Sequence, residues 1–287
     1  MSPRTQPPPG YVTAKEAGEI LGSMGMLYKH KNAGRIRRYL PGKDRKHGFY
    51  LEADVRRLAE EKHNFFDVQS KDATFSRATL TDMEGVVKLA SKLFHNVVPV
   101  INRQQWVFKE PRGHYVIKLA DGSVIAYAHI LAFPLDKIEA HMRHELRQQD
   151  FDIADVQAFQ SGQHYETLLV AIGVDPAIKE HRRRTALSSV LLRGISEDLA
   201  QIGKEGIIID HLYAWSDTNE GILLCAKMGM HPWAPPVKPS KTEKRRYSYV
   251  LDVLNSPIPL LQPYIQNIRR WMTEHSVSQE LNIKNEG

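Results

Sequence analysis

Residues 167–192 carry the sequence TLLVAIGVDPAIKEHRRRTALSSVLL, and this stretch decides the fold. The run Thr167–Val174 is almost entirely apolar, which is typical of a strand buried on both faces. Asp175 and Pro176 then end the strand, because proline cannot donate to a hydrogen-bonded ladder. Apolar residues next recur at helical spacing and predict a long helix over Ala186–Ile202. A buried strand followed by a long helix indicates the α/β class.

Strands and helices alternate on both sides of this stretch. Thr81 and Glu84 form a capping box, which predicts the start of a helix after a first strand. Asp121-Gly122 is a two-residue turn signal that predicts a hairpin. The expected strands are Ala73–Ala78, Tyr115–Leu119, Val124–Leu131, Ile207–Ala214 and residues 245–253, and the further helices are Ile138–Gln149 and Asp217–Met228. This order predicts an α/β domain with a mixed sheet over residues 73–255.

The positive charge of the chain is concentrated near its N-terminus. At 287 residues, with 42% hydrophobic and 25% charged residues, the chain has the length of two folded domains. The formal net charge is +6, with 13 Lys plus Arg against 7 Asp plus Glu in residues 1–66 and 26 of each in the rest. Such a basic cluster attracts polyanions, and a solvated basic surface is the alternative.

Two short helices are predicted within the basic segment. Thr13 and Glu16 form a capping box that opens the first helix, and Gly22 ends it. Ser23 caps the second helix, which stops at Gly34. Two short helices joined by a tight turn are a candidate helix-turn-helix motif.

A basic hairpin or wing follows around the turn Pro41–Asp44, and a third helix follows over Glu52–Ala59. This order, in YVTAKEAGEILG and KHKNAGRIRRYLPGKDRKHGFYLEADVRRLA, resembles the MerR-like and excisionase-like winged helix-turn-helix family. The resemblance implies a DNA-binding domain over residues 10–66 and a homodimer. The DNA contacts that it implies are Tyr28, Lys29, Lys31, Arg35, Arg37, Arg38, Arg45 and Lys46.

Three segments of the larger domain, LLVAIGVDPAIKEHRRRTALSSVLL, LYAWSDTNEGILLCAKMGM and RRYSYVLDV, are similar to the GNAT acyltransferase family. The likeness covers residues 73–252 and implies a mixed-sheet GNAT fold, acetyl-CoA as cofactor and an amine as acceptor. Helix N-terminal amides cradle a pyrophosphate in such a site, although Ala186 and Ser188 replace two glycines of the family pattern. The implied cofactor-binding residues are Ile172, Gly173, Val174, Arg183, Arg184, Thr185, Ala186, Leu187, Ser188 and Thr218.

Acyl transfer to an amine needs a base for the amine proton and an acid for the leaving thiolate. The same resemblance makes Glu166 the expected base. The second choices are His129, His164 and His211. Cys225 occupies the position where many family members carry a tyrosine acid, and Tyr213 or Tyr247 is the substitute.

The remaining segments are expected to be simple. Residues 1–9 are predicted to be a disordered leader, 67–72 a linker and 276–287 a disordered tail, whereas residues 256–275 predict an amphipathic helix. Cys225 is the only cysteine, which excludes an internal disulfide and fits a reducing cytoplasm. No metal site is expected. No apolar run approaches the roughly 20 residues of a membrane span, so no membrane association is expected.

Four functions are compatible with these features. The first is a DNA-binding N-acetyltransferase with a role in transcription regulation, whose acceptor is an amine of a protein, a metabolite or tRNA. The second is a transcription regulator whose degenerate GNAT domain senses acetyl-CoA or a metabolite without turnover. The third is a toxin-like acylator of charged tRNA, and the fourth is a modifier of DNA bases. The fold alone does not decide among them.

Overall fold

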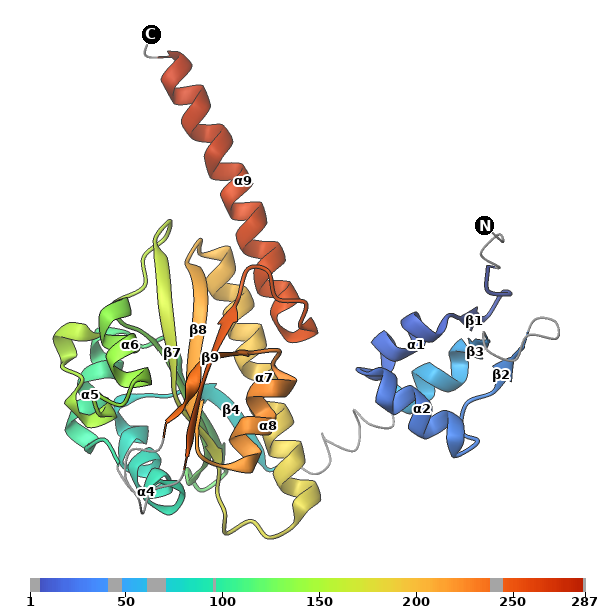
Figure 1. The fold of residues 1–287 in the computed structure, drawn as a ribbon, viewed down its shortest axis with the longest axis horizontal. Coiled ribbons are helices and arrows are strands. Elements are labelled where there is room, and N and C mark those ends of the chain that lie inside the picture. The colour runs from blue at the N-terminus through green and yellow to red at the C-terminus, as the bar shows by residue number, and fades with distance from the viewer. Residues whose placement is uncertain (1–5, 41–47, 61–70, 95–96, 238–244, 286–287) are drawn as a thin grey trace. The chain divides into compact units, whose positions relative to one another are not determined.

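The computed structural model describes residues 6–40, 48–60, 71–94, 97–237 and 245–285. The chain divides into two compact units, Met1–Gln69 and Ser70–Gly287, and each is described by itself (Figure 1). Positions 67–70 of the expected linker and 1–5 of the expected leader lie outside the described residues. None of the helices in the described part of the chain has the length and apolar character to cross a membrane.

The N-terminal unit combines short helices with a small antiparallel sheet. Its strands are β1 (Tyr11–Val12), β2 (Arg38–Tyr39) and β3 (Phe49–Leu51), in the order β1-β3-β2. Its helices are α1 (Ala14–Leu21), α2 (Met24–Asn32) and a third over residues 52–60. β2 and β3 form the arms of the expected wing. β1 has no counterpart among the expected elements, because two residues are too few to show an alternating pattern.

Local signals set the ends of α1 and α2. The amide of Glu16 donates to Thr13 Oγ1 at 3.2 Å, and the amide of Thr13 donates back to the Glu16 carboxylate at 2.7 Å. Gly22 ends α1 with φ 84°, a left-handed conformation that favours glycine. Ser23 caps α2 by accepting from the amide of Met26 at 3.2 Å. These caps fix the tight turn between α1 and α2.

The larger unit is built on a seven-stranded sheet in the described residues, with the order β4-β5-β6-β7-β8-β10-β9. β7 and β8 are parallel, and every other neighbouring pair is antiparallel. The strands are β4 (Ala73–Arg77), β5 (His114–Leu119), β6 (Val124–Ala132), β7 (His164–Val174), β8 (Ile208–Ser216), β9 (His231–Val237) and β10 (Arg246–Asp252). The expected α/β class with a mixed sheet is therefore confirmed.

Helices cover both faces of this sheet (Figure 1). The helices of one face are α4 (Met83–Leu93), α5 (Val100–Lys109) and α6 (Leu135–Met142), and those of the other are α7 (His181–Lys204), α8 (Asn219–Lys227) and α9 (Gln262–Asn285). Leu168 and Tyr213 point to the first face, where they pack with Trp106. Ile130 points to the second face and packs with Leu191 of α7. The sheet thus separates two apolar layers.

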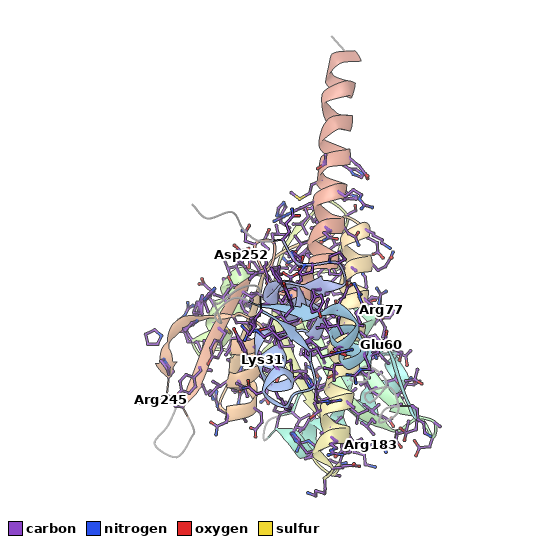
Figure 2. All side chains as sticks on the ribbon, turned by 90° about the vertical axis from the view of Figure 1, so that its right-hand side faces the viewer. Lys31, Glu60, Arg77, Arg183, Arg245 and Asp252 are labelled. Carbon is purple, nitrogen blue, oxygen red and sulfur yellow. The ribbon has the colours of Figure 1, made fainter. Side chains whose placement is uncertain are left out.

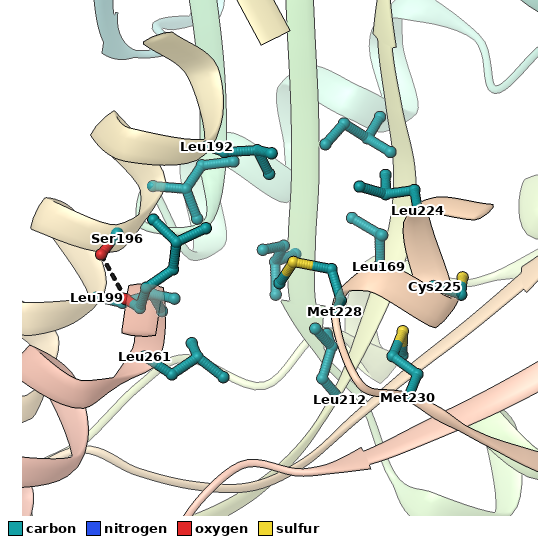
Figure 3. Close-up of a pocket in the computed structure, with 14 residues that line it drawn as sticks. Leu169, Leu192, Ser196, Leu199, Leu212, Leu224, Cys225, Met228, Met230 and Leu261 are labelled. Carbon is teal, nitrogen blue, oxygen red and sulfur yellow. Dashed lines mark hydrogen bonds between the residues drawn. The ribbon is translucent and has the colours of Figure 1, made fainter. Parts of the chain in front are cut away.

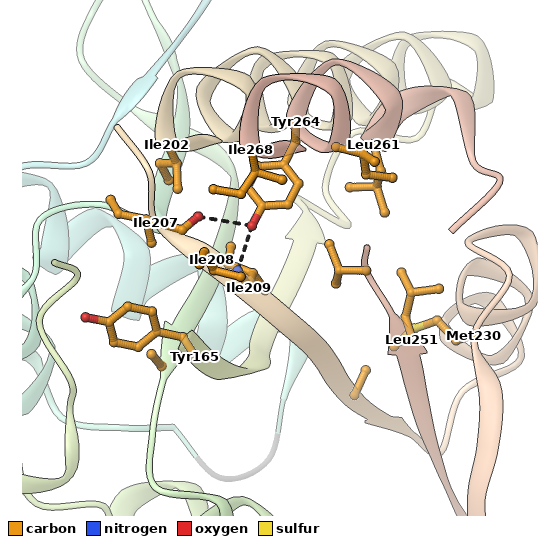
Figure 4. Close-up of a cluster of buried hydrophobic side chains, with 14 of the residues drawn as sticks. Tyr165, Ile202, Ile207, Ile208, Ile209, Met230, Leu251, Leu261, Tyr264 and Ile268 are labelled. Atoms are coloured by element: carbon orange, nitrogen blue, oxygen red, sulfur yellow. Dashed lines mark hydrogen bonds between the residues drawn. The ribbon is translucent and has the colours of Figure 1, made fainter. Parts of the chain in front are cut away.

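The C-terminal helix is anchored to the start of β8. The Tyr264 hydroxyl accepts from the amide of Ile209 at 2.6 Å and donates to the carbonyl of Ile207 at 3.1 Å (Figure 4). α9 continues to Asn285, so residues 276–285 are helical where a disordered tail was predicted. No glycine or proline follows Pro263 before the end of the helix, and nothing in the local sequence breaks it.

Two further elements differ from expectation. α6 ends at Met142 instead of continuing to Gln149, and His144 has a left-handed φ of 64° just beyond its end. The segment around Trp233, which has no counterpart among the expected elements, is strand β9. β9 is an edge strand of the sheet, and proline is tolerated there because the missing N–H faces away from the neighbouring strand.

Candidate functional site

β7 and β8 part from one another halfway along β7. Their pairing runs from His164 opposite Ile208 to Leu168 opposite Tyr213. β7 continues to Val174, and beyond Leu168 none of the described residues pairs with it on that side, although β6 still pairs with its other edge. A free strand edge presents unpaired N–H and C=O groups. The sheet therefore contains an internal opening, lined by the backbone of β7.

The register of β7 shows which peptide groups face this opening. The amide of Asp175 donates to the carbonyl of Ile125 at 2.8 Å, so Val174 lies at a position of the ladder whose own peptide groups point away from β6. Because the orientation of the peptide groups alternates along a strand, those of Ile172 also point away from β6. Both residues are among the predicted cofactor-binding residues. Gly173 between them faces β6. A Cβ on Gly173 would lie 2.5 Å from Leu93 of α4, so this glycine is needed for packing.

α7 begins earlier than the expected phosphate cradle. The amide of Arg184 donates to the carbonyl of Glu180 at 3.1 Å, which is the first intrahelical bond, and the helix begins at His181. The free amides of the first turn are therefore those of residues 181–183. With alanine and serine in place of the two glycines, the segment forms a regular helix, so its amides already donate to carbonyls of the preceding turn. The backbone amides of Arg184, Thr185, Ala186, Leu187 and Ser188 are therefore not free to form the expected cradle.

The first turn of α7 is strongly basic. Arg182, Arg183 and Arg184 follow one another there, and the turn contains no acidic residue. Figure 2 labels Arg183. Arg183 forms an ion pair with Asp72 at 2.6 Å, whereas Arg182 and Arg184 are exposed. Cations near a helix N-terminus oppose the helix dipole, and a bound anion relieves that repulsion. The turn is thus suited to hold phosphate.

An apolar cavity lies beside the opening, on the face of the sheet that α7 and α8 cover (Figure 3). Its free space is about 60 Å³. The lining includes Leu169 of β7, Leu212 of β8, Leu192 and Leu199 of α7, and Leu224 and Met228 of α8. Ser196 also lines the cavity, and its hydroxyl donates to the carbonyl of Leu260. The strand opening therefore leads into a hydrophobic chamber.

Glu166, His211 and Tyr213 meet on the opposite face, just before the strands part. His211 Nδ1 lies 3.0 and 3.1 Å from the two carboxylate oxygens of Glu166. A carboxylate only accepts, so Nδ1 carries the proton and Nε2 of the neutral ring has a free lone pair. Burial, and then the Glu166 carboxylate, raise the pKa of Tyr213 to about 12. Sequence reasoning ranked His211 second, because the pairing joins residues 45 positions apart.

Cys225 and Tyr213 are poorly suited to protonate a leaving thiolate. Cys225 lies on α8, is 4% exposed and lines the cavity (Figure 3). Burial raises its pKa to about 11. An ordinary thiol has a pKa of about 8.5, so proton transfer to its thiolate from either group is uphill. The structure therefore disfavours the acid role predicted for both residues.

The other histidines of the sheet have different environments. His129 is fully buried and accepts from Arg103 Nη1 at 2.9 Å. Burial, His114 and Arg103 hold the pKa of His129 well below its usual range, which makes it a poor base. His164 is exposed and donates to Asp210 at 2.9 Å. Among the described residues, no group of three or more His, Cys, Asp or Glu side chains is arranged to hold a metal.

Further side chains surround the opening. Thr218 caps α8 by accepting from the amide of Gly221 at 3.1 Å, and its predicted cofactor contact stays a prediction. Gln148 donates to the carbonyl of Val170, the bulged residue of β7, at 2.9 Å. The guanidinium of Arg246 lies over the Trp215 ring at 4.9 Å. Sequence reasoning missed Gln148 and Arg246, because their partners, Val170 and Trp215, are distant in the sequence.

The basic residues of the N-terminal unit fall into two groups. Tyr28 is 47% exposed on α2, with Lys31 Nζ 5.5 Å from its ring centroid (Figure 2). Arg37 instead binds Asp54, through its backbone amide at 2.9 Å and its Nε at 3.0 Å. The outer surface of α2 is therefore available, whereas Arg37 braces the unit. Lys29 also lies on α2, Arg35 and Arg38 lie in the described residues that follow, and Arg45 and Lys46 lie outside them.

Comparisons with known proteins give only distant likenesses. No family model and no curated protein matches the chain. An Ard1 protein from Thermoplasma volcanium is 14% identical with a TM-score of 0.40, over 63% of this chain and 97% of that one. The ribosomal-protein-S18-alanine N-acetyltransferase of Escherichia coli is 15% identical (TM-score 0.39, 63% and 93%). The yncA protein of Salmonella typhimurium, with its cofactor acetyl-CoA, is 16% identical (TM-score 0.42, 66% and 98%). These values are too low to assign an activity.

Proposed function

We propose that the larger unit is an acyltransferase that moves an acyl group from acyl-CoA, in the first instance acetyl-CoA, to an amine. The observation that carries this proposal is the parting of β7 and β8 beyond Leu168. One opening has a basic helix N-terminus at its outer end and an apolar cavity on one face of the sheet, while a carboxylate–histidine pair lies on the other. The GNAT resemblance of the sequence supports the same function.

The residues around the opening fit the parts of a CoA thioester. The amides of residues 181–183 and the exposed side chains of Arg182 and Arg184 suit its phosphates. The outward peptide groups of Ile172 and Val174 suit the amides of its pantetheine arm, which would add to the free edge of β7 as a strand does. When bound, the thioester supplies an acyl carbon that bonds to the amine nitrogen while the C–S bond breaks.

His211 is the base in this proposal, and Glu166 is its positioning residue. Nε2 of the neutral ring takes the proton that the acceptor amine loses. The Glu166 carboxylate, held at 3.0 Å from Nδ1, keeps the ring in the correct tautomer and stabilises the imidazolium. Glu166 is two residues from Leu168, or about 7 Å along the strand, where the opening begins. An ordinary thiolate, with a pKa of about 8.5 for its acid, leaves without help from Cys225.

Titration calorimetry of the full chain with acetyl-CoA tests the donor site. Thiol release is then followed with a panel of metabolite amines, protein N-termini and aminoacyl-tRNA. His211→Asn is expected to lower kcat about 100-fold or more, with little change in acetyl-CoA affinity. His164→Asn is the matched control, because it breaks a similar pair on the same strands, with Asp210. Absence of acetyl-CoA binding, or full turnover by His211→Asn, would refute the proposal.

A second candidate function is a sensor that binds acetyl-CoA without turnover. The regular helix at residues 184–188, where the family pattern has a glycine-containing loop, favours it. In this case calorimetry shows binding, no amine of the panel supports thiol release, and His211→Asn has no effect. If the domain is a sensor, adding acetyl-CoA changes the affinity of the full chain for DNA. By reciprocity, DNA then changes the affinity for acetyl-CoA by the same factor.

We also propose that the N-terminal unit binds DNA through α2 and the wing, as a homodimer, and so regulates transcription. The exposed surface of α2 and the charge excess of residues 1–66 support it. In fluorescence anisotropy with a mixed-sequence duplex, Lys29→Ala with Lys31→Ala should lower affinity and reduce the salt slope by about 2. Lys15→Ala, on α1 and paired with Glu19, is the control. Unchanged binding by the double variant contradicts the proposal, and light scattering tests the dimer.

A further inference from the structure

We propose that the cavity between α7 and α8 accepts the acyl group of the donor, and that it selects a short chain of about four or five carbons over acetyl. This inference rests on the proposed function. It assigns a ligand class to a space whose lining comes from three strands, from α7 and α8, and from the segment before α9, including Leu169, Leu192, Leu224 and Leu261 (Figure 3).

A ligand that binds along the free edge of β7, from the first turn of α7 inward, would end at the cavity. Along α7, Leu192 is 11 residues and Leu199 is 18 residues beyond His181. At 1.5 Å per residue these side chains stand about 16 and 27 Å from the basic first turn. Along β7, the outward peptide groups of Ile172 and Val174 lie between that turn and Leu169 at the cavity. A ligand held by its phosphates at the turn therefore brings its far end to the cavity.

The lining excludes polar ligand groups. The side chains around the space are aliphatic or sulphur-containing, apart from Ser196. The Ser196 hydroxyl already donates to the carbonyl of Leu260. An amide or an amine placed here would lose its hydrogen bonds to water and gain no partner, which costs several kcal/mol in an apolar environment. A hydrocarbon chain has no hydrogen bonds to lose, and its transfer from water into the cavity is favourable. The cavity is therefore suited to the acyl chain and not to pantetheine or the acceptor.

The size of the space sets the length of the chain. An apolar cavity of about 150 Å³ lined by similar side chains accepts benzene, with its six carbons. The 60 Å³ found here has room for about two or three carbons by the same proportion. With the carbonyl and the next carbon at the strand opening, the full acyl group has about four or five carbons. In acetyl the methyl is that next carbon, so an acetyl group would leave the space empty.

Binding of a chain-length series to the full protein tests this inference without any acceptor. Calorimetry compares CoA, acetyl-CoA, butyryl-CoA, isovaleryl-CoA and octanoyl-CoA. Each buried methylene is expected to tighten binding about fourfold, so butyryl-CoA should bind about 15-fold more tightly than acetyl-CoA. Octanoyl-CoA should lose this gain, because its chain exceeds the space. Equal or tighter binding of acetyl-CoA overturns the inference and leaves the donor site intact, whereas failure of all five ligands overturns the proposed function as well.

A cavity-filling variant tests whether this cavity is the space that holds the acyl chain. Leu192→Phe adds a ring to its wall and should reduce butyryl-CoA affinity to that of acetyl-CoA, without changing the affinity for CoA. Leu223→Phe on α8 is the matched control, because Leu223 is 54% exposed and outside the lining. Retention of the 15-fold preference by a folded Leu192→Phe protein would overturn the assignment. If that variant does not fold, the chain-length series on the unmodified protein decides alone.

Discussion

Removal of one hydroxyl should strongly destabilise the larger unit. Tyr264→Phe keeps the ring in place and removes both contacts with β8, the 2.6 Å bond from the Ile209 amide and the 3.1 Å bond to the Ile207 carbonyl. Ile207 and Ile209 are 1% and 3% exposed, so water does not readily replace the hydroxyl. A buried polar group left without a partner costs about 1 to 3 kcal/mol. For the two groups together we expect a loss of about 3 kcal/mol in the free energy of unfolding.

Tryptophan fluorescence during urea denaturation measures this loss. All four tryptophans lie in Ser70–Gly287, so the signal reports on the larger unit alone. The urea midpoint should fall while the m-value stays constant, and a scan should show Tm lowered by roughly 6 to 12 °C. Tyr249→Phe is the control, because Tyr249 belongs to the same apolar cluster and none of the hydroxyl bonds found involves it. A loss below about 0.5 kcal/mol for Tyr264→Phe would refute the reasoning.

Three further results are expected. Because burial raises the pKa of Cys225 to about 11, iodoacetamide at pH 8 should modify the native protein at least about tenfold more slowly than the urea-unfolded chain, as judged by mass spectrometry. Equal rates would contradict the burial. The Arg37 guanidinium holds the pKa of Asp54 at about 2, below its ordinary 3.8. The stability that this pair contributes is therefore complete above pH 4 and lost as the pH falls through 2. An NMR titration of the Asp54 carboxyl should have its midpoint near pH 2 and move upward in Arg37→Ala, and a midpoint near 3.8 in the unmodified protein argues against the pair. Finally, a Cβ on Gly194 would lie 2.5 to 2.6 Å from ring atoms of Phe75, so Gly194→Ala should lower the free energy of unfolding by about 2 kcal/mol in urea melts, and an unchanged midpoint would show that the ring moves freely.

The elements that the sequence predicted best are those with signals in a single short segment. The capping box at Thr13, the turn at Gly122 and the apolar run of β7 each depend on a few neighbouring residues. β9 was missed because three prolines argue against a strand unless its position at the sheet edge is known. The start of α7 was placed at Ala186 instead of His181, because its first residues are basic or polar and no apolar spacing marks them.

The candidate site depended on tertiary structure to a greater degree. Glu166 was identified from its place on the strand, but its partner His211 follows from the parallel register of β7 and β8. That register requires knowledge of how α7 returns the chain to the sheet. Burial also argues against the acid role predicted for Cys225, since exposure and pKa are properties of its surroundings and not of its position in a motif. Chemistry at this site is therefore set by contacts between distant segments.

The anchoring of α9 on β8 has a consequence for the synthesis of the protein. Tyr264 is 55 residues later in the chain than Ile209, whose amide donates a hydrogen bond to its hydroxyl. At about 5 to 20 residues per second, the ribosome produces the hydroxyl about 3 to 10 seconds after the strand that needs it. During this interval the start of β8 lacks its cover, while the N-terminal unit has long since emerged. The nascent larger unit thus passes through a stage at which chaperones would recognise it.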